Sequence, residues 1–121
     1  MATLVIMVLD DVEKLEDVMH VWRRAGAGGV TILASSGAGR LTGAVGSRED
    51  FPLLPSLRTV MAAQEVLHRT LFTVLEDDVD VEAFFDATEQ VVGRFDGPFT
   101  GVIMAVPVLS VRGANRRPEE R

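Results

Sequence analysis

A glycine-rich segment about a third of the way along the chain is the stretch best suited to binding chemistry. It spans Ser36–Gly43 and reads Ser-Gly-Ala-Gly-Arg-Leu-Thr-Gly. Closely spaced glycines let backbone amides converge on one centre, and Arg40 adds a positive charge, so the segment could cradle an anion. The same glycines would equally serve a turn that needs positive φ angles. The spacing matches neither the G-x-G-x-x-G nor the G-K-[ST] phosphate-binding pattern.

The connection that follows this segment, up to about Pro55, is long and rich in turn-forming residues. A regular scaffold that carries one long connection generally uses it to touch a ligand or a partner. Three charges and an aromatic ring near its middle could form a protein-contact tip, in which the ring is the anchor: Arg48, Glu49, Asp50 and Phe51. A solvated loop whose ring folds back onto the domain is the alternative.

Side chains suited to catalysis or metal binding form no recognisable set. The two histidines, His20 and His68, lack the spacing of a metal pair, and cysteine is absent. The acidic run that begins at Glu76 suits the start of a helix better than a cation site. No nucleophile motif surrounds the candidate serines, and nothing in the sequence links a histidine to them: Ser35, Ser36 and Ser47. We therefore expect a protein that is not an enzyme and has no metal site.

These residues must be positioned by strands, which the hydrophobic pattern predicts at four places. Nearly continuous apolar runs rich in branched side chains are typical of buried strands. Pro107, inside the last run, suggests a bulge or a sheet edge. The predicted strands are Thr3–Leu9, Val30–Ser35, Leu67–Leu75 and Gly101–Val111.

Two helices are predicted between these strands. The first follows Asp10, which would cap it together with Glu13, and Gly26 begins the glycine-rich stretch that stops it. The acidic run at Glu76 opens the second helix, whose apolar stripe continues to Phe95.

The order of elements predicts an α+β fold of the ferredoxin-like βαβ-βαβ type. It has a four-stranded antiparallel sheet, two helices on one face and a long loop after the second strand. Residues 1–112 would form a single domain, and residues 113–121, which are polar and charged, a flexible tail. The first and last strands are apolar at successive positions, so the sheet face without helices also needs cover. An oligomer formed through that face follows.

Composition narrows the class of protein further. Apolar residues make up 47% of the 121 residues, which is typical of a globular chain. The net charge of −6 argues against general nucleic-acid binding. No apolar run reaches the length of a membrane span, and the N-terminus lacks signal-peptide features. We expect a cytoplasmic protein that meets membranes only indirectly, through a partner.

Three segments together resemble the PII signalling family, the nitrogen regulatory protein P-II type. They are Leu4–Leu9 with the capped helix behind it, Gly29–Leu33 leading into Gly37–Arg40, and Thr100–Val108 with its proline. The resemblance spans about residues 3–112. It implies a homotrimer of ferredoxin-like subunits whose sheets face one another, with ligand clefts between subunits. The family's partner-gripping loop would run from about Arg40 to Leu57.

The chain also departs from that family's pattern, so it resembles a divergent member. It has no tyrosine, which excludes a uridylylated tyrosine in the loop. The family's second cleft loop corresponds to Gly93–Gly101, which has no lysine. Arg94 could replace that lysine, and Asp96 would oppose a phosphate. The C-terminal arginine motif of the family is reduced to Arg112-Gly113.

The resemblance thus implies a regulator in nitrogen or related metabolic control. It would bind a small anionic effector, with ATP, ADP or AMP as the leading candidates, at subunit clefts. Loop 40–57 would then signal to an unidentified partner protein. The alternative is a CutA-like or structural trimer without nucleotide binding. The expected ligand-binding residues are Gly37, Gly39, Arg40, Arg94, Thr100 and Arg112.

Overall fold

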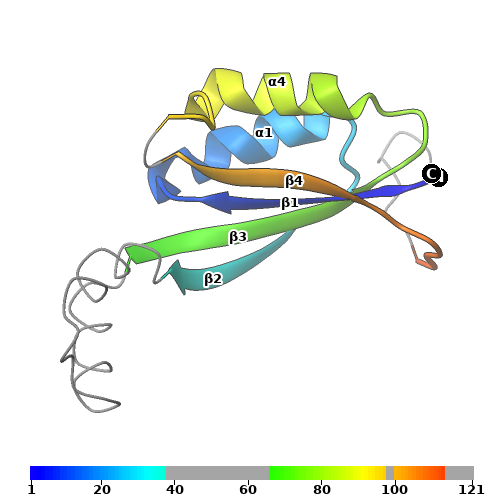
Figure 1. Ribbon diagram of the computed structural model, residues 1–121, viewed down its shortest axis with the longest axis horizontal. Coiled ribbons are helices and arrows are strands. Elements are labelled where there is room, and N and C mark those ends of the chain that lie inside the picture. Colours follow the sequence, from blue (N-terminus) through cyan, green and yellow to red (C-terminus); the bar gives the residue numbers. More distant parts are fainter. Residues whose placement is uncertain (38–65, 98–99, 114–121) are drawn as a thin grey trace, which may run out of the picture.

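Two helices lie side by side on one face of a four-stranded antiparallel sheet whose strand order is β2-β3-β1-β4 (Figure 1). The computed structural model describes residues 1–37, 66–97 and 100–113. The predicted ferredoxin-like α+β fold is confirmed. In chain order the elements are β1 (Thr3–Leu9), the 3-10 turn η1 (Val12–Lys14), α1 (Leu15–Ala25), β2 (Thr31–Gly37), β3 (Val66–Leu75), α4 (Val81–Val92) and β4 (Gly101–Pro107).

The start of the first helix differs from the prediction by one residue. Asp11, rather than Asp10, is the N-cap, and its Oδ1 accepts a hydrogen bond from the Glu13 amide at 3.1 Å. A 3-10 turn follows, closed by the Lys14 amide on the Asp11 carbonyl, and the α-helix begins at Leu15. β1 continues to Leu9, so the chain reaches helical geometry one residue later than the capping pattern indicated.

The second helix is shorter than its apolar stripe. Asp80, not the acidic run at Glu76, caps it by accepting from the Ala83 amide at 3.2 Å. Gly93 ends the helix with a φ of 96°, a conformation that glycine adopts without strain. Phe95 therefore lies beyond the helix, although its side chain still packs against the core.

β4 is also shorter than predicted, because it ends at Pro107 rather than Val111. Pro107 pairs with Thr3 at the end of an edge strand, where the proline's missing amide hydrogen costs no sheet hydrogen bond. The Val108 amide makes one more bond, to the Ala2 carbonyl at 3.0 Å. The predicted edge position of Pro107 is thus confirmed.

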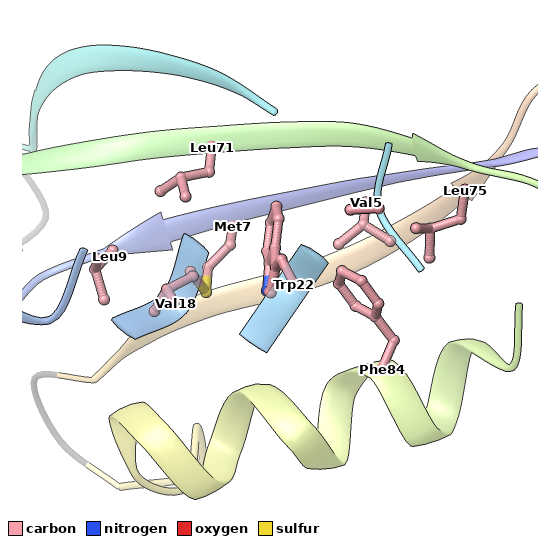
Figure 2. Close-up of a cluster of buried hydrophobic side chains, with 9 residues drawn as sticks. Val5, Met7, Leu9, Val18, Trp22, Leu71, Leu75 and Phe84 are labelled. Atoms are coloured by element: carbon pink, nitrogen blue, oxygen red, sulfur yellow. The ribbon is translucent and has the colours of Figure 1, made fainter. Parts of the chain in front are cut away.

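The core lies between the sheet and the helices (Figure 2). Alternate residues of β1 point into it, and Trp22 of α1 meets Phe84 of α4 with ring centroids 5.0 Å apart. Their ring planes are tilted by 50°, a geometry that aromatic pairs favour. The large side chains that are buried there are Val5, Met7, Leu9, Val18, Trp22, Leu71, Leu75 and Phe84.

A buried chain of hydrogen bonds joins the two helices through this core. The Trp22 Nε1–H donates to Thr88 Oγ1 at 2.9 Å, and the Thr88 hydroxyl donates to the Phe84 carbonyl at 2.9 Å. Both side chains are fully buried. Among the described residues, Thr88 is the acceptor for the indole N–H, and water cannot reach this buried group.

Replacing Thr88 with valine keeps the side-chain shape and removes that acceptor. We expect Thr88→Val to lower the free energy of unfolding by about 1–3 kcal/mol, because the indole N–H stays buried without a partner. Urea denaturation measures the change. The double variant with Trp22→Phe is the control: once the donor is gone, the Thr88→Val cost should shrink. A loss below about 0.5 kcal/mol in the single variant would contradict this account.

Candidate functional site

Most of the predicted ligand-binding residues that the structure describes lie at one end of the sheet, where β2 and β1 end and β4 begins. Gly37 ends β2 there, and Thr100 precedes Gly101, which pairs with Leu9 at the same end of β1. The C-terminal end of α4, just before Arg94, lies over this end of the sheet as well (Figure 1). Gly37 and Gly101 belong to the two outer strands. Three strand spacings lie between those strands, and the register places Gly37 three residues beyond the row that joins Ala34 to Gly101, so the two glycines are more than about 14 Å apart.

Arg112 lies at the opposite end of the molecule. β4 runs for seven residues from Gly101 to Pro107, roughly 20 Å, and Arg112 follows its far end (Figure 1). The described residues of one chain therefore do not bring Arg112 and Arg94 together. A ligand that touches both needs a second copy of the chain.

The remaining predicted site residues lie outside the described residues, so their roles stay predictions. They are Gly39 and Arg40 at the loop base, and Arg48, Glu49, Asp50 and Phe51 in the partner-contact tip.

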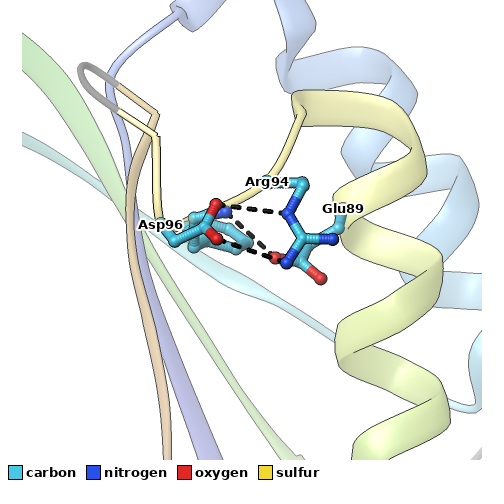
Figure 3. Close-up of polar contacts among 4 residues, drawn as sticks. Glu89, Arg94 and Asp96 are labelled. Atoms are coloured by element: carbon cyan, nitrogen blue, oxygen red, sulfur yellow. Dashed lines mark hydrogen bonds and ion pairs between the residues drawn. The ribbon is translucent and has the colours of Figure 1, made fainter.

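A tight turn follows α4 and carries Arg94. The Gly97 amide donates to the Arg94 carbonyl at 3.2 Å, which closes the turn. The Arg94 guanidinium donates from Nε and Nη2 to the two carboxylate oxygens of Asp96, each at 3.2 Å (Figure 3). Both side chains are largely exposed, so this two-pronged ion pair stands in water at the sheet edge.

Arg94 and Asp96 each stabilise the charged form of the other. The hydrogen bond from Arg94, and then its charge, lowers the pKa of the Asp96 carboxyl below its ordinary value of 3.8. The hydrogen bond to Asp96 and the charges of Asp96 and Glu89 raise the pKa of Arg94. At neutral pH the positive charge of Arg94 is therefore already balanced by a carboxylate of the same turn.

The only lysine of the chain is engaged close to this turn. Lys14 Nζ donates to the Val91 carbonyl in the last turn of α4, at 3.2 Å, in a partly buried contact. A cation at a helix C-terminus satisfies a carbonyl that has no partner within the helix and offsets the helix dipole. Lys14 thus joins the first turn after β1 to the end of α4.

The base of the long loop holds a polar cluster that the sequence did not reveal. Strand register pairs Ser35 with His68, and Ser35 Oγ lies 2.6 Å from His68 Nδ1 and 2.9 Å from Thr70 Oγ1. The expectation that no histidine is linked to the serines is therefore wrong for Ser35. Register across a hairpin with so long a connection cannot be read from the pattern of either strand alone.

His68 fits this place because Gly37, on the neighbouring strand, has no side chain. The imidazole is 9% exposed, and a Cβ added at Gly37 would lie 2.8 Å from its Nε2. One ring nitrogen is thus bonded to Ser35 and the other faces the Gly37 backbone. The cluster anchors the strand ends from which the long loop leaves.

The sheet face opposite the helices is largely apolar, with the Ser35–His68 cluster at its end near the long loop, and the described residues leave its apolar part uncovered. Its side chains alternate along each strand with those of the core, as strand geometry requires. Leu33 of β2 is 50% exposed and Met104 of β4 is 42% exposed, while Phe72 between them is half-buried. The exposed apolar residues of this face include Leu33, Val102, Met104 and Val106.

Two hollows in the described part of the chain lie in the helical layer. One of about 300 Å³ lies between Arg24 and Phe84, and one of about 440 Å³ lies between Val21 and Val91. Neither is lined by a predicted ligand-binding residue. Over the described ranges, no three acidic or histidine side chains are grouped to hold a metal ion. No helix there is long and apolar enough to cross a membrane.

Comparison with known proteins finds similar structures but no similar sequences. No family model matches the chain, and a search of curated proteins finds no significant match. Among solved structures, the Arabidopsis thaliana PII bound to citrate aligns with a TM-score of 0.59 and 17% identity, over 99% of this chain and 92% of that one. The fold is that of PII proteins.

GlnK of B. subtilis gives the same result in two structures. Its ATP complex aligns with a TM-score of 0.57 and 14% identity, over 87% of this chain and 79% of that chain. A second GlnK structure aligns with a TM-score of 0.59 and 13% identity, over 89% and 85% of the two chains. At such identities the PII fold is shared, while the ligand of this chain must be argued from its own residues.

The tight contact at Gly37 generates a prediction. Gly37→Ala places a methyl group against His68 Nε2, so the imidazole must move and its contact with Ser35 weakens. We expect the ring resonances of His68 to shift in NMR spectra, as they should in Ser35→Ala. His20, which is exposed on α1, is the internal control and should keep its resonances. Unchanged His68 resonances in both variants would contradict the described contact.

Proposed function

We propose that the protein is a divergent PII-type regulator that acts as a homotrimer. It binds a small anionic effector at clefts between subunits, with an adenine nucleotide as the leading candidate, and is not an enzyme. Loop 40–57 then signals to a partner protein in nitrogen or related metabolic control in the cytoplasm. The observation that carries this proposal is the PII fold over nearly the whole chain, shared with a protein solved with ATP and another solved with citrate.

The uncovered sheet face supports assembly on physical grounds. Four strands present apolar side chains on a face that the two described helices do not cover. An exposed apolar surface of this kind is costly in water and marks an interaction site. Packing sheet against sheet in a closed symmetric oligomer covers it in every copy at once.

The division of the predicted ligand residues supports a site between copies. Arg94 and Thr100 lie at one edge of the sheet, and Arg112 lies beyond the opposite end of β4. A neighbouring copy can bring its Arg112 near the Arg94 edge, which a single chain does not do. ATP and citrate, the molecules in the two PII-fold structures, are both polyanions that arginines suit.

Assembly through the sheet face can be tested with one charge. The wild-type chain should have a native mass about three times its 13.1 kDa by light scattering. We expect Met104→Asp to shift the protein to monomer, because it buries a carboxylate in the interface. Gln90→Asp adds the same charge on the exposed side of α4 and should leave the trimer intact. A monomeric wild type, or a trimeric Met104→Asp variant, would contradict this interface.

Effector binding is tested by calorimetric titration of the trimer with ATP, ADP and AMP. Heat of binding and a raised melting temperature are expected with at least one of them, because a ligand of the folded state stabilises it. Arg94→Gln should weaken binding about tenfold or more by removing a charged contact. Absence of both heat and melting shift with all three nucleotides would rule out the nucleotide proposal.

The same samples separate a regulator from a CutA-like or structural trimer. In a regulator, the ligand changes the accessibility of loop 40–57, so protease cleavage within this segment should slow when the effector is added. Cleavage that is equally fast with and without every nucleotide favours the structural trimer.

A further inference from the structure

The turn after α4 already holds two carboxylates where an anionic ligand would bind. Figure 3 shows Asp96 facing the Arg94 guanidinium, with Glu89 of α4 beside them. The chain's own acids therefore occupy the positively charged part of the turn.

Glu89 accepts hydrogen bonds from two backbone amides of the turn. Its Oε2 accepts a hydrogen bond from the Phe95 amide at 2.9 Å, and its carbonyl accepts from the Gly93 amide at 2.9 Å. The Gly97 amide donates to the Arg94 carbonyl. Amides that are to cradle a phosphate must point to the ligand, and these three point to acceptors of the chain itself.

Asp96 pairs with the Arg94 guanidinium in the geometry that a bound carboxylate or phosphate would use. Two parallel N–H groups of Arg94 meet its two oxygens, each at 3.2 Å. The side chains are 79% and 70% exposed, so the pair is accessible from solvent and weak enough for a ligand to displace. A ligand that uses the same two N–H groups must exchange with Asp96, and a ligand at any part of the guanidinium meets the charge of this carboxylate.

We infer that Asp96, aided by Glu89, is a built-in competitor that filters effectors by charge. The inference rests on the proposed function, because it concerns the same effector site. An anionic group that binds Arg94 through Nε and Nη2 displaces Asp96, and one that binds the other N–H groups lies close to the Asp96 carboxylate, so in both positions this carboxylate repels the ligand. Repulsion grows with ligand charge, so Asp96 weakens the binding of ATP or pyrophosphate more than that of AMP.

Isosteric amides test the filter without changing side-chain size. Asp96→Asn and Glu89→Gln each remove one negative charge, and each keeps an oxygen that accepts a hydrogen bond. Asp86→Asn, on the exposed side of α4, makes the same charge change away from the turn and is the matched control. Calorimetry of each full-length variant with ATP, AMP and inorganic pyrophosphate gives the affinities, and thermal melting verifies folding.

We expect Asp96→Asn to bind ATP and pyrophosphate about tenfold more tightly than Asp86→Asn does, with a gain of about threefold or less for AMP. Glu89→Gln should give a smaller gain in the same order. The Arg94 Nε–H resonance should shift in Asp96→Asn without ligand, and in the wild type when pyrophosphate is added. Equal affinities in Asp96→Asn and Asp86→Asn, or weaker binding in Asp96→Asn, would overturn the inference.

The outcomes separate this inference from the proposed function. Wild-type binding of nucleotides that is the same in Asp96→Asn defeats the filter and leaves the effector proposal standing. Binding of nucleotides and pyrophosphate that appears only in Asp96→Asn supports the filter and defeats the nucleotide proposal for the wild type. No binding of any probe to any variant defeats both.

Discussion

Two helices can cover only one face of a four-stranded sheet, and the rest of this structure follows from that limit. The covered face holds the core around Trp22 and Phe84, where burial is complete. The opposite face keeps Leu33, Met104 and their apolar neighbours exposed in a single chain. The stability of the subunit and the proposed assembly therefore depend on opposite faces of the same strands.

The same strands also decide where the predicted ligand-binding residues lie. Antiparallel pairing brings the end of β2, the end of β1 and the start of β4 to one end of the sheet. Arg112 lies beyond the opposite end of the sheet. At the first end the positive charge of Arg94 is balanced within its own turn by Asp96. An effector there would compete with an acid of the chain, which makes ligand charge a determinant of affinity.

Much of the fold was predictable because it depends on local patterns. Continuous apolar runs identified β1 and β3 nearly to the residue, and helical spacing identified both helices. The errors fall at element ends, where one hydrogen bond decides. Asp11 and Asp80 cap the helices in place of residues that looked equally suitable. Pro107 ends β4, although the apolar pattern continues beyond it.

The sequence by itself determined the order of elements, the apolar second face of the sheet and the candidate status of Arg94, because these depend on residue type and spacing. Only the tertiary structure decided which side chains meet. Strand register, which a long connection leaves open, brings His68 to Ser35, and the length of β4 separates Arg112 from Arg94. In the turn after α4, the Arg94 guanidinium donates to Asp96 and the Phe95 amide donates to Glu89. The backbone geometry of the turn decides these partners, which composition does not determine.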